Sequence, residues 1–289
     1  MKRVAAVLLL LALASAVGSL HTGLAEIRAS YPTEFRSYYI PQSAYLKVAS
    51  MGQRNLWADL IFLWGVQYFD RYGKDVRTAY LYHTFDVLTD LDPRFYEAYI
   101  FGFLFLSLDQ AWKDLYRLAD KGLSANPQNW LLAWDAGTYA FFQARDYDRA
   151  ARYFQIAHDR NPGETLVQDM LANAYKYRGD YEASRAFWLR IRDQFEGDDS
   201  FRGRFYRMAA ERNLFDLHIK IDLKALEGAV ARYRQERGAF PPRLLDLVRA
   251  GYLQALPADP DGDPYLYDPA TGKVSCSKPF HYKGEYGQW

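Results

Sequence analysis

Residues 127–162 read PQNWLLAWDAGTYAFFQARDYDRAARYFQIAHDRNP, and this stretch decides the fold. Small residues recur in its first half at the i, i+3, i+4, i+7 spacing of one helix face: Ala133, Ala136, Gly137 and Ala140. A second stripe follows the turn at Arg145 and Asp146: Tyr147, Ala150, Phe154 and Ala157. Because small residues let another helix approach closely, the stretch predicts two antiparallel helices joined by a short turn.

The same pattern recurs along the chain. Pro93, Pro127 and Pro162 are 34 and 35 residues apart, and each follows Asp or Asn. Proline cannot continue a helix and restricts the residue before it, so each one predicts a corner between two helices. Self-similarity at this period is typical of stacked helix–turn–helix repeats. A helical bundle without repeats is the alternative.

This arrangement resembles the tetratricopeptide repeat. That family has a small residue on its first helix, then Ala, an aromatic residue and Ala on its second helix, and a closing Pro. The matching residues in the quoted unit are Gly137, Ala150, Phe154, Ala157 and Pro162. The next unit has Ala172, Ser184, Trp188, Ile191 and Glu196, and the preceding one keeps Gly102, Ala119 and Pro127 but has Leu115 and Gly122. The resemblance covers residues 55–200 and implies a mainly α fold, a superhelix of helix–turn–helix units.

The resemblance also implies a partner-binding groove lined by the first helix of each unit. Carried over to this sequence, its groove-facing positions include Tyr96, Tyr99, Phe103, Leu131, Trp134, Thr138, Phe141, Asp169, Asn173, Lys176 and Tyr177. An aromatic wall of this kind suits an apolar helix or a Pro-rich segment of a protein partner. Alternatively, the protein fills the groove itself, with the aromatic residues 30–48 as a plug.

The N-terminus has the layout of an export signal. Lys2 and Arg3 precede an uncharged run from Val4 to Leu20, so residues 1–25 are either a cleaved signal peptide or an N-terminal membrane anchor. The run stays uncharged through Leu24, past the small-residue cleavage options, which favours the anchor. Both interpretations place the rest of the chain at the periplasmic face of the inner membrane. Residues 26–54 then form an extended aromatic and Pro-containing segment.

The last ninety residues follow a different pattern. Residues 201–237 predict two capping or connecting helices, Phe201–Arg212 and Phe215–Gln235, and residues 238–289 predict a short helix and a β-hairpin. This module resembles the head of a type II secretion major pseudopilin in four short motifs: Gly238-Ala-Phe-Pro, Gly251-Tyr-Leu, Leu256-Pro-Ala-Asp-Pro and Gly262-Asp-Pro-Tyr. The family's hydrophobic N-terminal helix does not precede Phe215, so the resemblance implies a head module and not a filament subunit.

Three aspartates alternate in the C-terminal module. Asp259, Asp261 and Asp263 offer carboxylate oxygens of the kind that Ca²⁺ prefers. The EF-hand pattern is absent, because Pro264 and Ala270 stand where it needs Gly and Glu. The alternative is a polar turn in which the aspartates bond their own backbone. Apart from calcium, no cofactor is expected.

Composition and motifs narrow the function. With 36 Lys+Arg against 35 Asp+Glu, the chain lacks the basic excess of a nucleic-acid-binding protein. It contains one Cys, five scattered His and no nucleophile elbow, phosphate loop or dinucleotide fingerprint, so we expect no enzyme. The prediction is an exported scaffold that binds protein or peptide in the cell envelope, for assembly of a secretion or type IV pilus-like machine. The alternatives are a carbohydrate-binding envelope protein and a calcium-dependent filament component.

Overall fold

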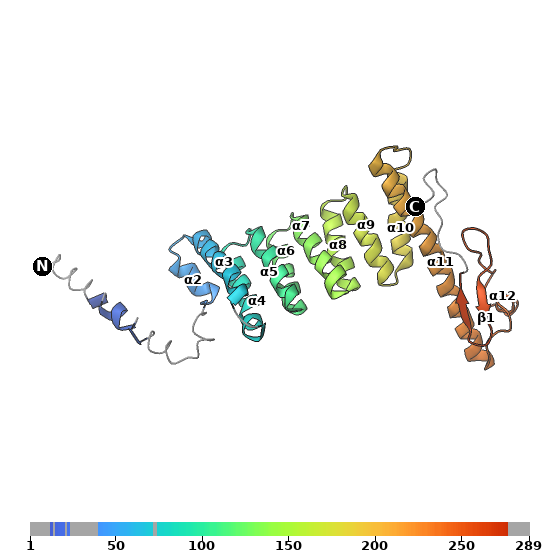
Figure 1. Ribbon diagram of the computed structural model, residues 1–289, viewed down its shortest axis with the longest axis horizontal. Coiled ribbons are helices and arrows are strands. Elements are labelled where there is room, and N and C mark those ends of the chain that lie inside the picture. The colour runs from blue at the N-terminus through green and yellow to red at the C-terminus, as the bar shows by residue number, and fades with distance from the viewer. Residues whose placement is uncertain (1–11, 14, 21, 24–39, 72–73, 277–289) are drawn as a thin grey trace. The chain divides into compact units, whose positions relative to one another are not determined.

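The chain is mainly helical, as the sequence predicts. The computed structural model describes residues 12–13, 15–20, 22–23, 40–71 and 74–276 (Figure 1). They form two compact units, which divide between Asn126 and Pro127. Most of the predicted export segment and plug lies outside the described residues, as do residues 277–289. Among the described residues, no helix has both the length and the apolar character needed to cross a membrane.

The first unit is a stack of helices. Its elements are α2 (Ser43–Ala49), α3 (Arg54–Arg71), α4 (Lys74–Leu91), α5 (Tyr96–Leu108) and α6 (Trp112–Ala125). Helix α3 packs against α4, and α5 against α6, while α4 also contacts α2, α5 and α6. The predicted corner at Pro93 falls between α4 and α5. Its carbonyl accepts a hydrogen bond from Asn126 Nδ2 at 2.8 Å, which ties this corner to the end of α6.

The second unit continues the helix–turn–helix scheme. Its repeat helices are α7 (Trp130–Thr138) with a π-helical extension η2 (Tyr139–Ala144), α8 (Tyr147–Arg160), α9 (Thr165–Tyr177) and α10 (Tyr181–Gln194). Each packs against the next along the chain. Asn129, Asp146 and Asp180 cap α7, α8 and α10 by accepting backbone N–H groups, which satisfies donors that a helix start leaves unpaired. The second and third predicted corners, Pro127 and Pro162, also lie between helices.

Glycine allows the two helices of a pair to approach closely. A Cβ added to Gly137 of α7 would lie 2.7 Å from the ring of Phe154 on α8, closer than real Cβ contacts. Phe154 is fully buried there. The first unit uses the same device, since a Cβ on Gly122 of α6 would lie 2.8 Å from the ring of Tyr99 on α5.

The prediction of two helices between residues 201 and 237 is wrong. A single helix of 37 residues, α11 (Phe201–Arg237), runs through the expected break. The repeat pattern fades after Phe205, but neither Gly nor Pro stands between Arg212 and Phe215 to stop a helix. The helix ends at Gly238, whose φ of 75° is the left-handed conformation that glycine adopts readily.

The C-terminal module packs on the second half of α11. Helix α12 (Leu245–Arg249) and the antiparallel strands β1 (Leu266–Asp268) and β2 (Lys273–Ser275) confirm the predicted short helix and hairpin. Their shared core consists of Leu226, Ala229, Val230, Leu247, Tyr265 and Val274. The Tyr265 hydroxyl donates to Asp222 of α11 at 2.8 Å. Since α11 also packs against α10, it contacts both the repeats and the C-terminal module.

Two glycine substitutions should shift stability in opposite directions. Gly137→Ala forces a methyl group against the buried Phe154 ring, so we expect the free energy of unfolding to fall by about 1–3 kcal/mol. Gly228→Ala on α11 meets no atom within 4 Å and removes backbone freedom from the unfolded chain, so stability should rise by roughly 0.5–1 kcal/mol. Urea unfolding followed by circular dichroism measures both. A Gly137→Ala variant as stable as the parent would contradict the close packing.

Candidate functional site

In the first unit, two of the three predicted groove residues belong to the core. Tyr99 and Phe103 on α5 have no exposed surface, so they cannot face a partner, and only Tyr96 is half-exposed. For Tyr99 the physical reason is Gly122, which stands where the repeat family usually has Ala. Its missing side chain leaves space on α6 that the Tyr99 ring fills. Burial accordingly raises the pKa of Tyr99 to about 12, and its hydroxyl donates to the carbonyl of Pro93 at 3.1 Å.

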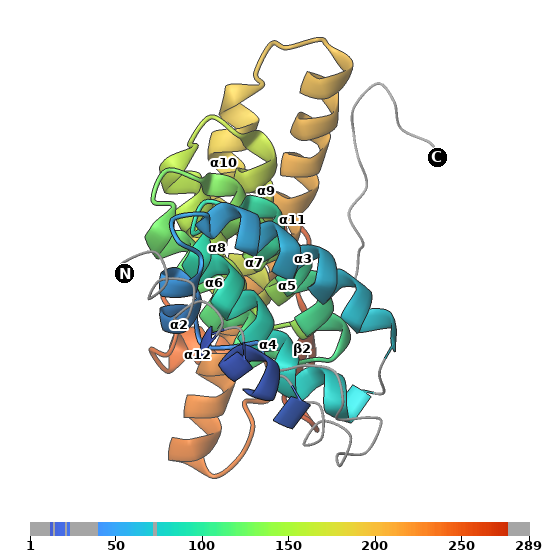
Figure 2. The same cartoon turned by 90° about the vertical axis from the view of Figure 1, so that its left-hand side faces the viewer.

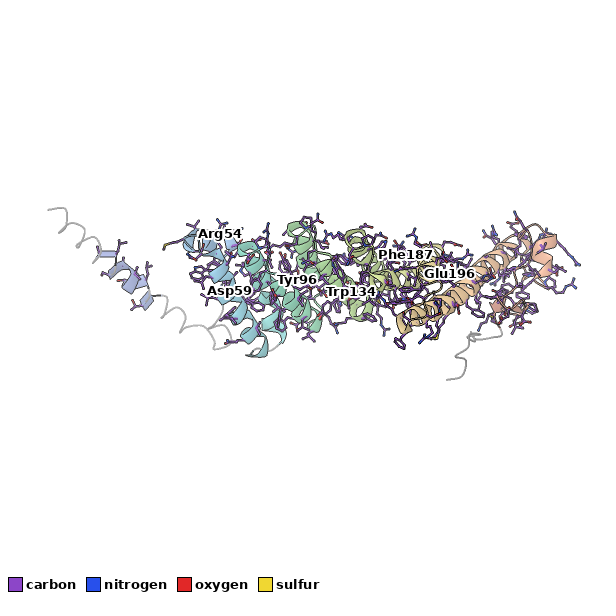
Figure 3. The ribbon with its side chains drawn as sticks, turned by 90° about the horizontal axis from the view of Figure 1, so that it is seen from above. Arg54, Asp59, Tyr96, Trp134, Phe187 and Glu196 are labelled. Atoms are coloured by element: carbon purple, nitrogen blue, oxygen red, sulfur yellow. The ribbon has the colours of Figure 1, made fainter. Side chains whose placement is uncertain are left out.

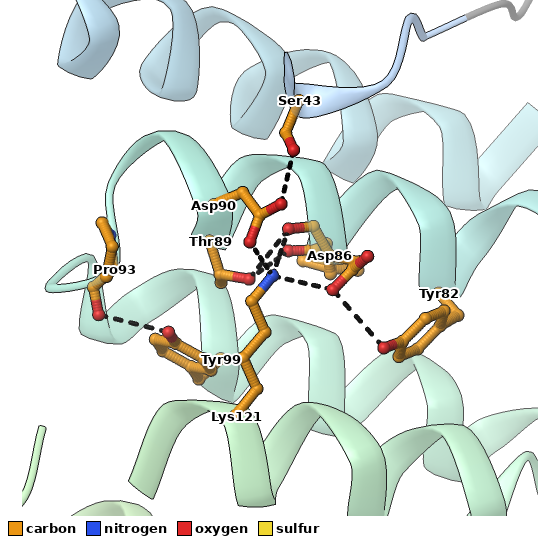
Figure 4. A network of polar contacts seen from close by, with 9 residues as sticks. Ser43, Tyr82, Asp86, Thr89, Asp90, Pro93, Tyr99 and Lys121 are labelled. Carbon is orange, nitrogen blue, oxygen red and sulfur yellow. Dashed lines mark hydrogen bonds and ion pairs between the residues drawn. The ribbon is translucent and has the colours of Figure 1, made fainter. Parts of the chain in front are cut away.

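A polar network centred on Lys121 joins three helices of the first unit (Figure 4). Lys121 on α6 lies 2.7 Å from a carboxylate oxygen of Asp86 and 2.7 Å from one of Asp90, both on α4. Asp90 also accepts a hydrogen bond from Ser43 at the start of α2. Burial alone would raise the pKa of Asp90, but the bonds from Lys121 and Ser43 outweigh it and lower that pKa. Since its groups are paired with one another, this network fixes α2 on the stack.

In the second unit, aromatic side chains gather where α7, η2, α8 and α9 meet. The ring of Phe141 lies edge-on to Tyr147 and to Tyr177, with centroids 5.4 and 5.5 Å apart. Tyr147 and Tyr177 stack on each other at 5.1 Å. Trp134, labelled in Figure 3, lies seven residues before Phe141, and its ring is 5.5 Å from that of the buried Phe154. Such pairs hold aromatic rings in fixed orientations.

This cluster has an exposed rim. Tyr177 is 56% exposed and Phe142 is 61% exposed, beside the half-exposed Phe141. Phe141 and Phe142 both lie in η2, and the π-helical turn adds a residue that re-aims side chains at the end of α7. Arg145 closes this turn in the left-handed conformation, with φ of 55°. The backbone here departs from regular helix where the rings reach solvent.

Polar side chains of α9 and α11 adjoin the aromatic cluster. Lys176 donates to Asn213 Oδ1 at 2.6 Å and lies 3.7 Å from the carboxylate of Asp216. Asp169 accepts a hydrogen bond from Asn173 Nδ2 at 2.6 Å. Burial raises the pKa of Asp169 to about 6. Burial also lowers the pKa of the neighbouring Lys176. The structure therefore places the ammonium group of Lys176 and the carboxyl group of Asp169 partly out of contact with water.

We call these side chains together the α7–α9–α11 face. It comprises Trp134, Phe141, Phe142, Tyr147, Asp169, Asn173, Lys176, Tyr177, Asn213 and Asp216. It brings together six of the eight groove residues predicted in this unit. The other two lie on α7: Leu131, which is 40% exposed, and Thr138 at its end. Sequence reasoning missed Phe142 and Tyr147, although the adjacent Phe141-Phe142 pair before a turn was a visible signal. It also missed Asn213 and Asp216, because they lie on a helix that the repeat pattern does not reach.

The three aspartates of the C-terminal module do not form the calcium cluster that their alternation suggested. Asp259 is buried, and its Oδ1 accepts the backbone N–H groups of Asp261 and Asp263 at 3.0 and 2.8 Å. Cys276 Sγ lies 3.7 Å from its other oxygen. Across the described part of the chain, no three His, Cys, Asp or Glu side chains are placed to hold a metal ion. The alternative, a turn that bonds its own backbone, is confirmed.

Comparisons with known proteins add no family. No protein-family model matches the chain, and no curated protein sequence matches it significantly. The resemblances to the tetratricopeptide repeat and to the pseudopilin head stay predictions from the sequence.

The buried acid gives a pH-dependent prediction. The pKa of Asp169 rises from 3.8 to about 6 on folding, so its stabilising contribution is complete below about pH 4 and is lost as the pH rises through 6. Asp169→Asn removes this titration. Relative to the parent, the variant should therefore gain about 1–2 kcal/mol of unfolding free energy between pH 4 and pH 7.5, since each pKa unit corresponds to about 1.4 kcal/mol and solvent screens part of it.

Asp180→Asn is the matched control, measured by the same urea unfolding at both pH values. A hydrogen bond from Arg178 holds the pKa of Asp180 below its usual value, so the contribution of Asp180 is present above the unfolded pKa and is lost as the pH falls. That loss falls below about pH 4, so between pH 4 and pH 7.5 the difference between Asp180→Asn and the parent should change little. Identical pH profiles for the parent and Asp169→Asn would show that this carboxyl is not perturbed.

Proposed function

We propose that this protein is a non-catalytic, exported scaffold of the bacterial cell envelope that binds a segment of another protein on its α7–α9–α11 face. Exposed aromatic rings held in place by their neighbours carry the proposal, because Tyr177 and Phe142 present apolar surface at little further cost in side-chain freedom. Aromatic residues of this kind dominate the energy of protein interfaces.

The polar residues of the same face would fix the register of the bound segment. Lys176 keeps donors beyond those bonded to Asn213 and Asp216, since an ammonium group carries three. Asn173, Asn213 and Asp216 add amide and carboxylate groups to the same face. The bound segment would be mainly apolar. Its backbone or polar side chains would hydrogen-bond these polar residues, and its apolar side chains would cover Phe142 and Tyr177.

The biological setting of the proposal comes from the sequence. An uncharged run behind Lys2 and Arg3 favours export, and the pseudopilin-like motifs of the C-terminal module favour a place in a secretion or type IV pilus-like assembly. In this account the repeats hold one partner, and the module on the second half of α11 contacts the assembly.

Truncating the exposed tyrosine should weaken binding. The probe is a fluorescent library of apolar helical and Pro-rich peptides, screened against the purified chain by anisotropy. For peptides that bind, Tyr177→Ala should raise Kd about 10-fold or more, as expected for the loss of roughly 1.4 kcal/mol or more at an interface anchor. Tyr45→Ala on α2 removes a tyrosine that is 68% exposed in the other unit and should leave Kd unchanged.

Two outcomes would refute the proposal. Equal affinity of Tyr177→Ala and the parent would move the binding site away from this face. Binding to glycans that Trp134→Ala abolishes, with no peptide binding, would favour the carbohydrate-binding alternative instead.

A further inference from the structure

Helix α3 is apolar on two opposite faces. Its inner face places Ala58 and Ile61 in the core of the first unit. Its outer face carries Leu56, Leu60 and Leu63 at the i, i+4, i+7 spacing of a single stripe, and they are 54%, 51% and 59% exposed. A helix on the surface of a water-soluble fold normally has one apolar stripe and a polar opposite face. The second stripe therefore needs a partner that the described residues do not supply.

Two further apolar side chains are exposed in the helix and turn that precede α3. Val48 on α2 is 80% exposed, and Met51, at the turn between α2 and α3, is 92% exposed. The backbone at Met51 is left-handed, with φ of 48°, a conformation that is unfavourable for a residue with a Cβ. An apolar side chain thus projects into solvent from a strained turn.

The position of α3 in the stack makes the stripe more unusual. Within the first unit α3 contacts α2, α4 and α5, and Figure 2 shows it across the front of that unit. The terminal helix of a repeat stack has no preceding repeat to cover its outer face, so that face is ordinarily polar. The outer face of α3 instead carries the three leucines.

We propose that this surface, formed by Val48, Met51, Leu56, Leu60 and Leu63, lies in the interfacial region of a lipid bilayer. Amphipathic helices bind there with their apolar face among the headgroups and upper acyl chains, without spanning the membrane. The proposal concerns this unit alone and does not depend on what the α7–α9–α11 face binds.

Three observations favour lipid over a protein partner. The first is the distance to the apolar run that ends at Leu24: residues 25–39 span at most about 50 Å when extended, so a membrane that takes up the run is within reach of α2. The second is tryptophan, which prefers the membrane–water interface. Trp57 is 38% exposed, and Trp64 is half-buried on the same side of α3 as Leu60.

The third observation is charge. From Ser43 to Gln67 the charged side chains are Lys47, Arg54 and Asp59. Arg54 and Asp59 both lie on α3 (Figure 3). Asp59 falls outside the stripe, since its position on the helix lies between Leu63 and the polar Asn55. The net positive charge suits a bilayer that contains anionic phospholipid.

The test measures lipid contact at single positions of the full chain. In a Cys276→Ser background, Leu60→Cys and Leu108→Cys each carry an environment-sensitive fluorophore, and the protein is reconstituted in vesicles of phosphatidylethanolamine and phosphatidylglycerol with a quencher on the acyl chain. Leu108 is the matched control, because it is 56% exposed on α5 of the same unit. We expect the label at position 60 to lose at least half of its fluorescence and the label at position 108 to lose little.

Each other pattern overturns the proposal. If both labels stay open to a water-soluble quencher and escape the lipid quencher, the surface faces water. If the label at position 60 is protected from both quenchers, a protein covers it, either a second copy of this chain or another partner. Equal lipid quenching at positions 60 and 108 would mean that lipid contact is not specific to this surface.

A second variant separates this surface from the N-terminal run as the source of lipid contact. Leu56→Gln, Leu60→Gln and Leu63→Gln together leave the core residues of α3 unchanged, so circular dichroism should match the parent. A fluorophore at Met51→Cys should be quenched by lipid in the parent and at least two-fold less in the triple variant. Undiminished quenching would mean that the N-terminal run alone holds the chain at the bilayer.

Discussion

The rest of the structure depends on one constraint, the contact between a glycine and an aromatic ring on the facing helix. Gly137 against Phe154 in the second unit, and Gly122 against Tyr99 in the first, bring paired helices closer than any Cβ would allow. Protein interiors are packed without voids, so the position of each ring follows from the empty space opposite it. Rings that fill such space are core. Rings that do not, such as Phe142 and Tyr177, remain exposed.

Local chemistry made much of the fold predictable. The Asx-Pro corners at Pro93, Pro127 and Pro162 depend on residues adjacent in sequence, and each is found where it was expected. What the sequence could not show depends on other helices. Tyr99 looks like a groove residue until the space beside Gly122 on the facing helix is known. The continuity of α11 was hidden because a fading repeat pattern was taken for a helix end.

The candidate site was also predictable only in part, because some of its residues come from a helix distant in sequence. Phe141, Asn173, Lys176 and Tyr177 are groove positions that the resemblance to the repeat family implies. Asn213 and Asp216 come from α11, and their role depends on a hydrogen bond between residues 37 positions apart. Asp259 shows the converse: its carboxylate looked like a metal ligand, yet it bonds two backbone N–H groups within four residues.

Site-directed photocrosslinking tests the central claim, binding through the α7–α9–α11 face, most directly. A photoreactive phenylalanine analogue replaces Phe142 on this face or Glu182 on α10, both exposed, in cells that produce the protein with its natural partners. The account predicts a discrete adduct with one protein from position 142 and none from position 182. Adducts of equal yield at both positions, or none at either, would contradict it.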